Sequence, residues 1–359
     1  MMPVSGSVAR NSHTLAEILS QPEVWRSCSR GLAEDVAFQS MRSRACTRRL
    51  WLFIGCGTSF YLAETAAACW TLLTGSPARA LPASELLLFP QLAQLGDRDL
   101  QAVVISRSGK TSEAVRAADL LARKYKVATL GITCARESDL AKACELTIAL
   151  PEADEKSMVM TRSFSSMLLL LLQLAAEVTD AQIFPSALDH VSAAVGSAIR
   201  TWNDQVESFV LKHSFADYIY LAQGPFYPVA REAALKITEM SCSYAQAYHT
   251  LEFRHGPKSI VAPQTCIAFF LSESAMQAES EVLLEMKELG GTIITICNRA
   301  DESVRKSSDL LFELDANVPE PLLVAPFIVP AQLLGYHTGV KKGFNPDEPK
   351  NLSRVVILD

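Results

Sequence analysis

Residues 102–111 read AVVISRSGKT, a short apolar run that ends in a loop of hydroxyl-bearing, small and basic residues. Residues 50–59 read LWLFIGCGTS and follow the same plan, with glycines and hydroxyls after the apolar run. Helix-length segments follow both loops, over about 60–73 and through about residue 124, and residues 128–133 form a third apolar run. Strands that alternate with helices of this length predict βαβ units and a parallel sheet.

The same pattern returns in the second half of the chain. Residues 218–224, YIYLAQG, match the first apolar run and its glycine, and residues 267–275, IAFFLSESA, match the second run and its loop. Gly224 follows Gly57 by 167 residues, and Ser272 follows Ser106 by 166 residues. This near-constant offset indicates a tandem duplication of one α/β unit.

The expected organisation follows from the repeat. We predict an α/β protein made of two tandem parallel-sheet sandwiches of the flavodoxin-like or Rossmann-like kind. The predicted limits are an N-terminal helical segment at 1–42, a first, phosphate-binding domain at 43–190, a second domain with the catalytic helix at 205–348, and a C-terminal tail at 349–359 that closes the site. Helical spacing over residues 13–42 predicts one or two surface helices there.

Composition narrows the functional classes. The 359 residues are 49% hydrophobic and 20% charged, as in soluble globular proteins, and the net charge of −6 disfavours nucleic-acid binding. The nine cysteines form no C-x-x-C pair, which predicts reduced thiols and no metal site. The start lacks a signal peptide, and the most apolar run, 167–176, is too short for the ~20 residues of a membrane span. We therefore expect a cytoplasmic protein with no nucleic-acid or membrane partner.

The loop at 106–111 is a candidate phosphate site. It follows a strand and opens a helix, and helix N-termini offer unpaired N–H groups and a positive dipole end to anions. Ser106, Ser108 and Thr111 supply hydroxyl donors, and Gly109 lets the backbone approach a ligand closely. The alternative is an ordinary serine-rich N-cap. The matching loop of the second half carries Glu273, an acid where phosphate would lie, so we expect one anion site per chain.

Three further features could carry chemistry. The loop at 55–59 lies at the carboxyl end of a strand, where it suits a polyol ligand or a plain tight turn. A helix over 228–241 places Glu232, Lys236 and Glu239 on one face, either as an exposed salt-bridged surface or as proton-transfer groups. His255, two residues before Pro257, is an acid/base candidate near neutral pH, although a lone histidine is more often structural or simply exposed.

Together these motifs resemble the sugar isomerase (SIS) domain family in its tandem form, over about residues 50–359. The closest likeness is to the isomerase half of glutamine–fructose-6-phosphate amidotransferase. Stand-alone glucosamine-6-phosphate deaminases are similar as well. The motifs that carry the resemblance are Cys56-Gly57-Thr58-Ser59, Ser106-x-Ser-Gly-x-Thr111, Glu232-x-x-x-Lys236-x-x-Glu239, Glu252-x-x-His255-Gly-Pro257 and Asn351-Leu352.

The resemblance implies roles for these residues. Glu239 would be the base that moves a proton between C1 and C2, Lys236 its helper, and His255 the ring-opening group, reaching across from a partner subunit. A homodimer with shared active sites, a sugar 6-phosphate substrate, and no cofactor or metal are implied too. The implied phosphate ligands are Ser59, Ser106, Ser108 and Thr111, and the implied sugar ligands are Cys56, Gly57, Thr58 and Arg354.

Departures from the family point to a particular reaction. No glutaminase domain precedes the repeats, and Arg354 stands where the synthase has an imine-forming lysine, which a guanidinium cannot replace. Met160 stands where the synthase has a serine in its sugar site. We therefore expect a deaminase that converts glucosamine 6-phosphate to fructose 6-phosphate and ammonia. The alternatives are an aldose–ketose isomerase, a fructosamine-phosphate deglycase, a non-catalytic sugar-phosphate sensor and, on fold alone, a dehydrogenase.

Overall fold

The computed structural model describes residues 12–45, 50–93, 95–96, 99–179 and 184–358. Residues 1–11 of the predicted N-terminal segment lie outside this description. The chain divides into two compact units. We call them the first-sheet unit, Glu23–Glu155 with Arg162–Asp189 and Ser353–Asp359, and the second-sheet unit, Met1–Pro22 with Lys156–Thr161 and His190–Leu352.

The first-sheet unit is built on five parallel strands in the order β2-β1-β3-β4-β5. This order, 2-1-3-4-5 along the chain, is that of a flavodoxin-like doubly wound sheet. It confirms the predicted parallel α/β sandwich. The strands are β1 (Leu50–Gly55), β2 (Ala78–Pro82), β3 (Leu100–Ile105), β4 (Ala128–Thr133) and β5 (Leu146–Ala149).

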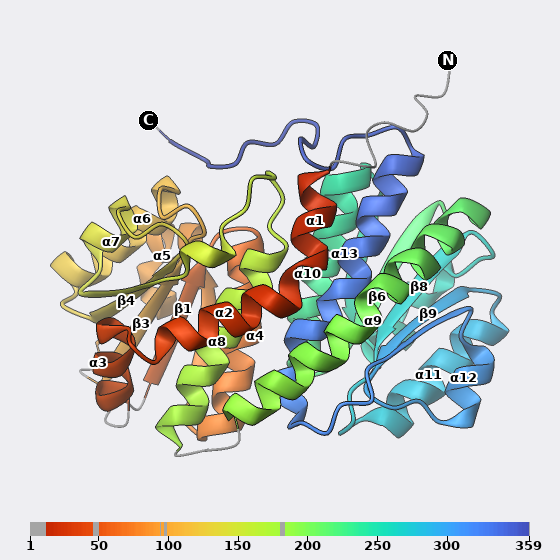
Figure 1. Ribbon diagram of the computed structural model, residues 1–359, viewed down its shortest axis with the longest axis horizontal. Coiled ribbons are helices and arrows are strands. Elements are labelled where there is room, and N and C mark those ends of the chain that lie inside the picture. The colour runs from red at the N-terminus through yellow and green to blue at the C-terminus, as the bar shows by residue number, and fades with distance from the viewer. Residues whose placement is uncertain (1–11, 46–49, 94, 97–98, 180–183, 359) are drawn as a thin grey trace. The chain divides into compact units, whose positions relative to one another are not determined.

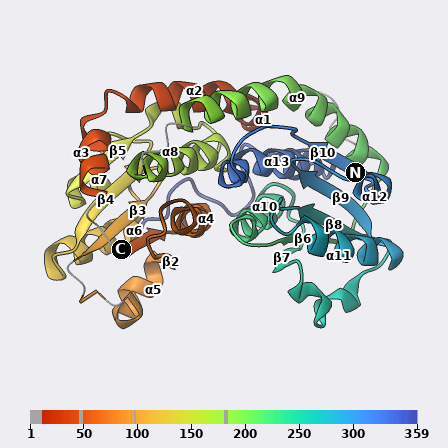
Figure 2. The same cartoon turned by 90° about the horizontal axis from the view of Figure 1, so that it is seen from below.

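Side chains alternate between the two faces of this sheet, and both faces are covered. Leu52 and Ile54 of β1 enter one core with the apolar faces of α5 (Ala83–Leu88), α6 (Ser112–Asp119) and α7 (Asp139–Ala143). Trp51 packs against Trp70 of α4 (Thr58–Thr74), with ring centroids 3.9 Å apart and the ring planes tilted by 38°. Helices α4 and α8 (Arg162–Val178) run together beside the sheet (Figure 2). Such two-sided burial explains why the central strands are continuous apolar runs.

The second-sheet unit repeats this topology with the order β7-β6-β8-β9-β10. Helices α10 (Phe226–Ser241) and α13 (Val324–Lys341) pack on each other beside the sheet, and α11 (Met276–Glu288) and α12 (Glu302–Ser307) belong to the opposite core (Figures 1 and 2). The identical strand order supports the tandem duplication. The strands are β6 (Asp217–Ala222), β7 (Ala245–His249), β8 (Thr265–Phe270), β9 (Thr292–Cys297) and β10 (Leu310–Glu313).

The remaining helices differ in part from expectation. Three helices precede the first strand, where one or two were predicted: α1 (His13–Leu19), α2 (Gln21–Leu32) and α3 (Val36–Ala45). They are not purely superficial, since Ile18 and Trp25 are buried. The helix predicted through residue 124 ends at Asp119 and continues as a π-helical turn, η2 (Leu120–Lys124). The other elements are α9 (Phe184–Lys212) and the 3₁₀ turns η1 (Pro90–Ala93), η3 (Pro151–Ala153), η4 (Glu252–Arg254), η5 (Pro257–Ile260) and η6 (Glu320–Leu323).

One helical run among the described residues is long and apolar enough to cross a membrane. It is Glu320–Lys341, formed by η6 and α13, and 94% of its most apolar window is buried inside the fold. Burial of this kind is what the central helix of a globular core shows.

Candidate functional site

The loop after β3 is shaped by Gly109. Its φ of +61° favours glycine, and a Cβ there would lie 2.3 Å from the Ser138 hydroxyl oxygen. The Gly109 N–H donates to the Ser106 carbonyl at 3.1 Å, which closes the loop on itself. Thr111 is the N-cap of α6, yet its side chain makes no capping hydrogen bond, and the Ser106 hydroxyl donates to it at 3.3 Å. The Thr111 hydroxyl is therefore not used as an ordinary N-cap, whereas the Ser108 hydroxyl accepts from the Lys110 N–H at 3.2 Å.

The loop after β1 lies next to it. Strand β1 pairs with β3, with Ile54 opposite Val104, so the two loops leave neighbouring strands at the same carboxyl edge. The chain order reverses between these strands, which is where ligands bind in open α/β sheets. A Cβ on Gly55 would lie 2.2 Å from the Ser59 carbonyl oxygen, so glycine permits the tight entry into α4. The structure thus brings the predicted phosphate and sugar loops together.

The four residues that follow β1, from Cys56 to Ser59, differ in their environments. Cys56 is half-buried, and burial, followed by the charge of Glu113, raises its pKa to about 11. Thr58 and Ser59 open α4 and are buried. Gly57 immediately precedes them with a φ of +55°. Cys56 is therefore a neutral thiol at neutral pH and can act as a hydrogen-bonding or packing group rather than as a nucleophile.

The positive charge of Arg107, within the phosphate loop, is already paired with an acid. Its side chain is 5% exposed, and its Nη1 lies 3.3 Å from Oε2 of the fully buried Glu155. Its Nη2 donates to the carbonyl oxygen of Arg354 at 3.3 Å. The guanidinium of Arg354 in turn lies 2.7 Å from Oδ1 of Asp154. Both arginines are paired with acids within the first-sheet unit, whereas Lys110 is exposed.

The C-terminal tail contacts the start of α6. The N–H of Ser112 donates to the Val356 carbonyl at 3.2 Å, and the N–H of Leu358 donates to the Ser112 hydroxyl at 3.0 Å. Arg116 donates to the Leu358 carbonyl at 3.1 Å. Pairing of this kind between backbone groups leaves no signal in the sequence, so these contacts were not predicted.

Helix α10 carries a buried charged cluster. Lys236 Nζ lies 3.1 Å from Glu232 Oε1 and 2.6 Å from Glu239 Oε2, and the side chains of Glu232 and Lys236 are fully buried. The exposed salt-bridged face considered from the sequence is therefore wrong. Burial lowers the pKa of Lys236, but the charges of Glu232 and Glu239 and their hydrogen bonds outweigh it, and the pKa is raised overall. Lys236 is an ammonium held between two carboxylates.

Only Glu239 of this cluster reaches solvent, with 16% of its side chain exposed. The close approach of α13 covers the rest, because Gly335 and Gly339 leave room for the α10 backbone; a Cβ on Gly339 would lie 2.2 Å from the Met240 carbonyl oxygen. An accessible carboxylate beside a buried ammonium can accept and return a proton at one position.

Comparison with known proteins identifies the family. The model of the SIS domain matches residues 46–177 and 217–338, which together make up most of the chain. The chain belongs to the SIS domain family. We call these two segments the first and second SIS domains.

Three individual proteins show what the chain is similar to. Glutamine–fructose-6-phosphate aminotransferase [isomerizing] of Methanothermobacter thermautotrophicus is 27% identical over 308 residues, covering 86% of this chain and 51% of that protein. The chain thus spans about half the length of the curated relatives it matches. The crystal structure of a Thermotoga maritima glucosamine-6-phosphate deaminase is 28% identical, with a TM-score of 0.80 over 97% of this chain and 100% of that one. Tagatose-6-phosphate ketose/aldose isomerase of Escherichia coli, 23% identical with a TM-score of 0.83, shares the fold over 100% of this chain and 98% of its own.

The second SIS domain contains His255 in an anchored loop. His255 follows η4 and is exposed. Its neighbours Arg254 and Lys258 hold the two carboxylate oxygens of Glu285 on α11, at 2.7 and 2.6 Å. The loop is therefore tied to the helix behind it, while the imidazole faces solvent.

The loop after β8 is the counterpart of the phosphate loop, and its donors are already used. Oε2 of the buried Glu279 accepts from the Ser272 N–H at 2.8 Å and from the Ser272 hydroxyl at 2.6 Å, and its Oε1 accepts from Thr250 at 3.0 Å. Burial raises the pKa of Glu279, opposed by these hydrogen bonds. The expectation named Glu273 as the acid in place of phosphate. Glu279, which sequence reasoning missed, fills that position, while Glu273 is exposed.

Proposed function

We propose that the chain is a phosphosugar isomerase of the SIS type that deaminates an amino-sugar 6-phosphate, with glucosamine 6-phosphate as the expected substrate. The observation that carries this proposal is the cluster of Glu232, Lys236 and Glu239, in which the partly exposed Glu239 is the one of the two carboxylates that can meet a substrate. Similarity over its full length to a protein described as glucosamine-6-phosphate deaminase supports the choice of reaction.

The proposed chemistry is a proton transfer followed by hydrolysis. In the open-chain aldose, Glu239 removes the proton at C2 and returns it at C1, while O1 gains a proton and the amino nitrogen loses one. The net change converts the 2-amino aldose to the C2 imine of the ketose. Water then adds to the C2 imine carbon, and the C2–N bond breaks to give fructose 6-phosphate and ammonia. The ammonium of Lys236 stabilises the carboxylate form of Glu239 between turnovers and the negative charge that develops during the transfer.

The loop at Ser106–Thr111 is proposed to bind the substrate phosphate. Its hydroxyls and the start of α6 offer donors, and the opposite charges of Arg107 and Glu155 already cancel, so the exposed Lys110 is the nearby cation. His255 keeps its proposed role in ring opening for a partner subunit of a homodimer, with which its solvent-facing position is compatible.

The first prediction concerns Glu239. Glu239→Gln keeps the shape of the side chain but cannot accept a proton, so kcat for ammonia release should fall by about 10²–10⁴-fold while Kd for the substrate changes little. Stopped assays of ammonia and calorimetric binding measure the two quantities. Glu288→Gln, the same change at an exposed position of α11, is the control and should keep full activity. Full turnover by Glu239→Gln would contradict the proposal.

The choice of substrate is tested separately. Ammonia and fructose 6-phosphate should appear in equal amounts from glucosamine 6-phosphate and not from its N-acetyl form, whose nitrogen cannot leave as ammonia. Interconversion of a non-amino aldose and ketose phosphate without ammonia release would favour the plain isomerase instead. Ligand-induced stabilisation without turnover of any of these sugars would favour a sensor.

A further inference from the structure

The side chain of His255 has no anchor of its own. The residue is exposed, and its imidazole makes no hydrogen bond or ion pair within the part of the chain that the structure describes. Its backbone N–H donates to the Glu252 carbonyl at 2.9 Å, and the ring of Phe253 is buried against Tyr248, with ring centroids 5.4 Å apart. The position of the imidazole is therefore set by the backbone of its loop and by the groups that hold that backbone.

Glu285 of α11 holds this loop by two cations. Its Oε2 accepts from Arg254 Nε at 2.7 Å, and its Oε1 accepts from Lys258 Nζ at 2.6 Å. The hydrogen bonds from Lys258 and Arg254 lower the pKa of Glu285, so the group is a carboxylate at neutral pH. Three residues, 255–257, separate the two cations in the chain. A single carboxylate thus closes a short ring around the backbone of His255.

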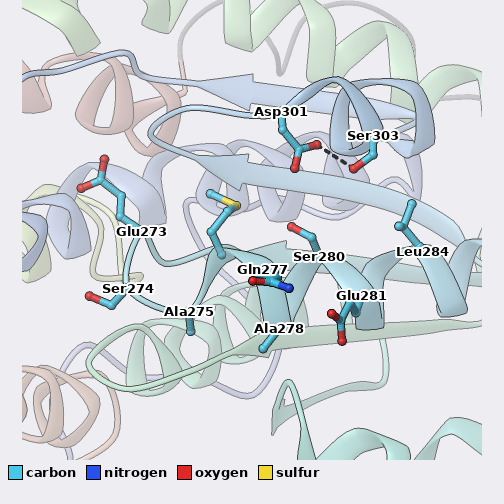
Figure 3. Close-up of a pocket in the computed structure, with 11 residues that line it drawn as sticks. Glu273, Ser274, Ala275, Gln277, Ala278, Ser280, Glu281, Leu284, Asp301 and Ser303 are labelled. Carbon is cyan, nitrogen blue, oxygen red and sulfur yellow. Dashed lines mark hydrogen bonds between the residues drawn. The ribbon is translucent and has the colours of Figure 1, made fainter.

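Glu285 stands on a firmly packed part of α11. Its neighbours on that helix are fully buried in the core beside the second sheet: Val282, Leu283 and Met286. Another face of α11, which includes Glu281 and Leu284, lines a pocket of about 740 Å³ (Figure 3). Glu285 does not line this pocket, and both of its carboxylate oxygens bind the loop of His255 instead. The anchor of the loop is therefore as rigid as the core behind it.

We propose that Glu285 is a positioning residue for His255, which holds the imidazole where ring opening of the sugar needs it. The inference rests on the proposed function for the role of His255. A group that takes part in a reaction must be held within about 0.5 Å of its productive position. A displacement of about 1 Å can lower the rate about 10²-fold. Because the imidazole has no partner of its own, release of both cations by Glu285 would move it directly.

The experiment uses Glu285→Gln, which keeps the shape of the side chain and removes its charge. We expect kcat/KM for ammonia release from glucosamine 6-phosphate to fall about 10- to 100-fold. Trypsin should cleave the Arg254–His255 bond about 5- to 30-fold faster, as the loss of one or two exposed ion pairs permits. The side chains of this cluster are 30–40% exposed, so the variant should fold and melt like the wild type. In a chain that carries His255→Asn, Glu285→Gln should lower the residual activity no further.

The matched control is Lys287→Gln. It breaks another ion pair of α11, with Asp309 at 2.7 Å and similar exposure, and should change neither activity nor cleavage at Arg254. Unchanged cleavage in Glu285→Gln, unchanged kcat/KM despite faster cleavage, or a further loss in the His255→Asn chain would each overturn the proposal. A wild type that releases no ammonia would reject the proposed function instead, and faster cleavage of Glu285→Gln would still support the anchoring of His255.

Discussion

At the scale of single residues, burial decides which charged groups can take part in chemistry. Glu232 and Lys236 are fully buried and form an ion pair, so they can orient Glu239 and stabilise its charge but cannot meet a substrate. The partly exposed Glu239 can exchange a proton. Spacing in the sequence placed the three residues on one helix face. It could not distinguish a solvated face from a buried one, because that depends on the approach of α13, about a hundred residues later in the chain.

The second prediction concerns the thiol of Cys56. With its pKa raised to about 11, only about one thiol in a thousand is ionised at pH 8, and the thiolate is the reactive form. Iodoacetamide should therefore modify Cys56 slowly at pH 8 and much faster as the pH approaches 11. The exposed Cys242 serves as an internal comparison in the same mass spectrum. Modification of Cys56 at the same rate as Cys242 at pH 8 would contradict the assignment.

The third prediction concerns the buried pair of Arg107 and Glu155. Arg107→Met removes the guanidinium that faces the buried Glu155 carboxylate and should cost about 3–5 kcal/mol in the free energy of unfolding. The double variant Arg107→Met, Glu155→Met should recover most of this loss, because no unpaired charge remains. Urea denaturation measures both variants.

The control for this pair is Arg123→Gln. Arg123 bonds Asp119 at the surface, with side chains 78% and 45% exposed, so the loss should stay below about 1 kcal/mol. An equal loss for Arg107→Met and Arg123→Gln would show that the buried pair is not special. Glu155 lies 48 residues after Arg107 in the sequence, which is why the pairing of Arg107 could not be predicted from the loop motif alone.

At the scale of secondary-structure elements, the central strands were predictable and the edge strands were not. Strands β1, β3, β4, β6, β8 and β9 are buried on both faces and appear as apolar runs that end in turn residues. The edge strands β2 and β7 are half-buried and contain mixed residues, and β5 and β10 have four residues each. Short, half-exposed strands lack both the length and the periodicity that a sequence pattern needs.

The fourth prediction compares two glycines at element ends. Gly109→Ala must overcome both a left-handed backbone and a Cβ 2.3 Å from the Ser138 hydroxyl oxygen, so we expect a loss of about 2–4 kcal/mol and weaker binding of sugar phosphate. Gly75→Ala, at the end of α4, has a φ of +69° with open space around its Cβ, and should lose only about 1 kcal/mol. Thermal unfolding separates the two, and equal losses would mean that the clash is relieved elsewhere.

At the scale of the whole molecule, the duplication predicted from one offset is present as two sheets of identical strand order. What the offset could not predict is how far the halves differ at their carboxyl edges. The position of Glu279 on α11 shows no special pattern in the sequence. Its effect depends on Ser272 and Thr250 meeting in space, which only the folded chain provides.

The fifth prediction concerns acid stability. Burial, opposed by the charge of Asp204, lowers the pKa of His337 to about 4, while an unfolded histidine titrates near 6.5. Between these values the unfolded chain binds the additional proton, so stability falls as the pH is lowered from about 6.5 to 4. The contribution is up to about 3 kcal/mol.

The variant His337→Gln should flatten this part of the stability curve while keeping a group that can donate to Asn203, which His337 contacts at 2.9 Å. His190→Gln, at an exposed site, should leave the curve unchanged. Urea midpoints measured across this range of pH provide the comparison. A parallel slope for the wild type and His337→Gln would show that other groups dominate.

The Glu279 carboxylate fixes the loop after β8 even when no ligand is bound. The Glu279 carboxylate accepts both Ser272 donors from within the chain. The loop at the edge of the second sheet therefore needs no bound anion to be ordered. In the first loop the Ser106 N–H donates to the Ile132 carbonyl at 3.0 Å and the Ser106 hydroxyl donates to Thr111 at 3.3 Å, and neither acceptor is charged. Under the proposed function, the copy with the internal carboxylate is therefore ordered without a ligand, and only the other copy would respond to the concentration of a sugar phosphate.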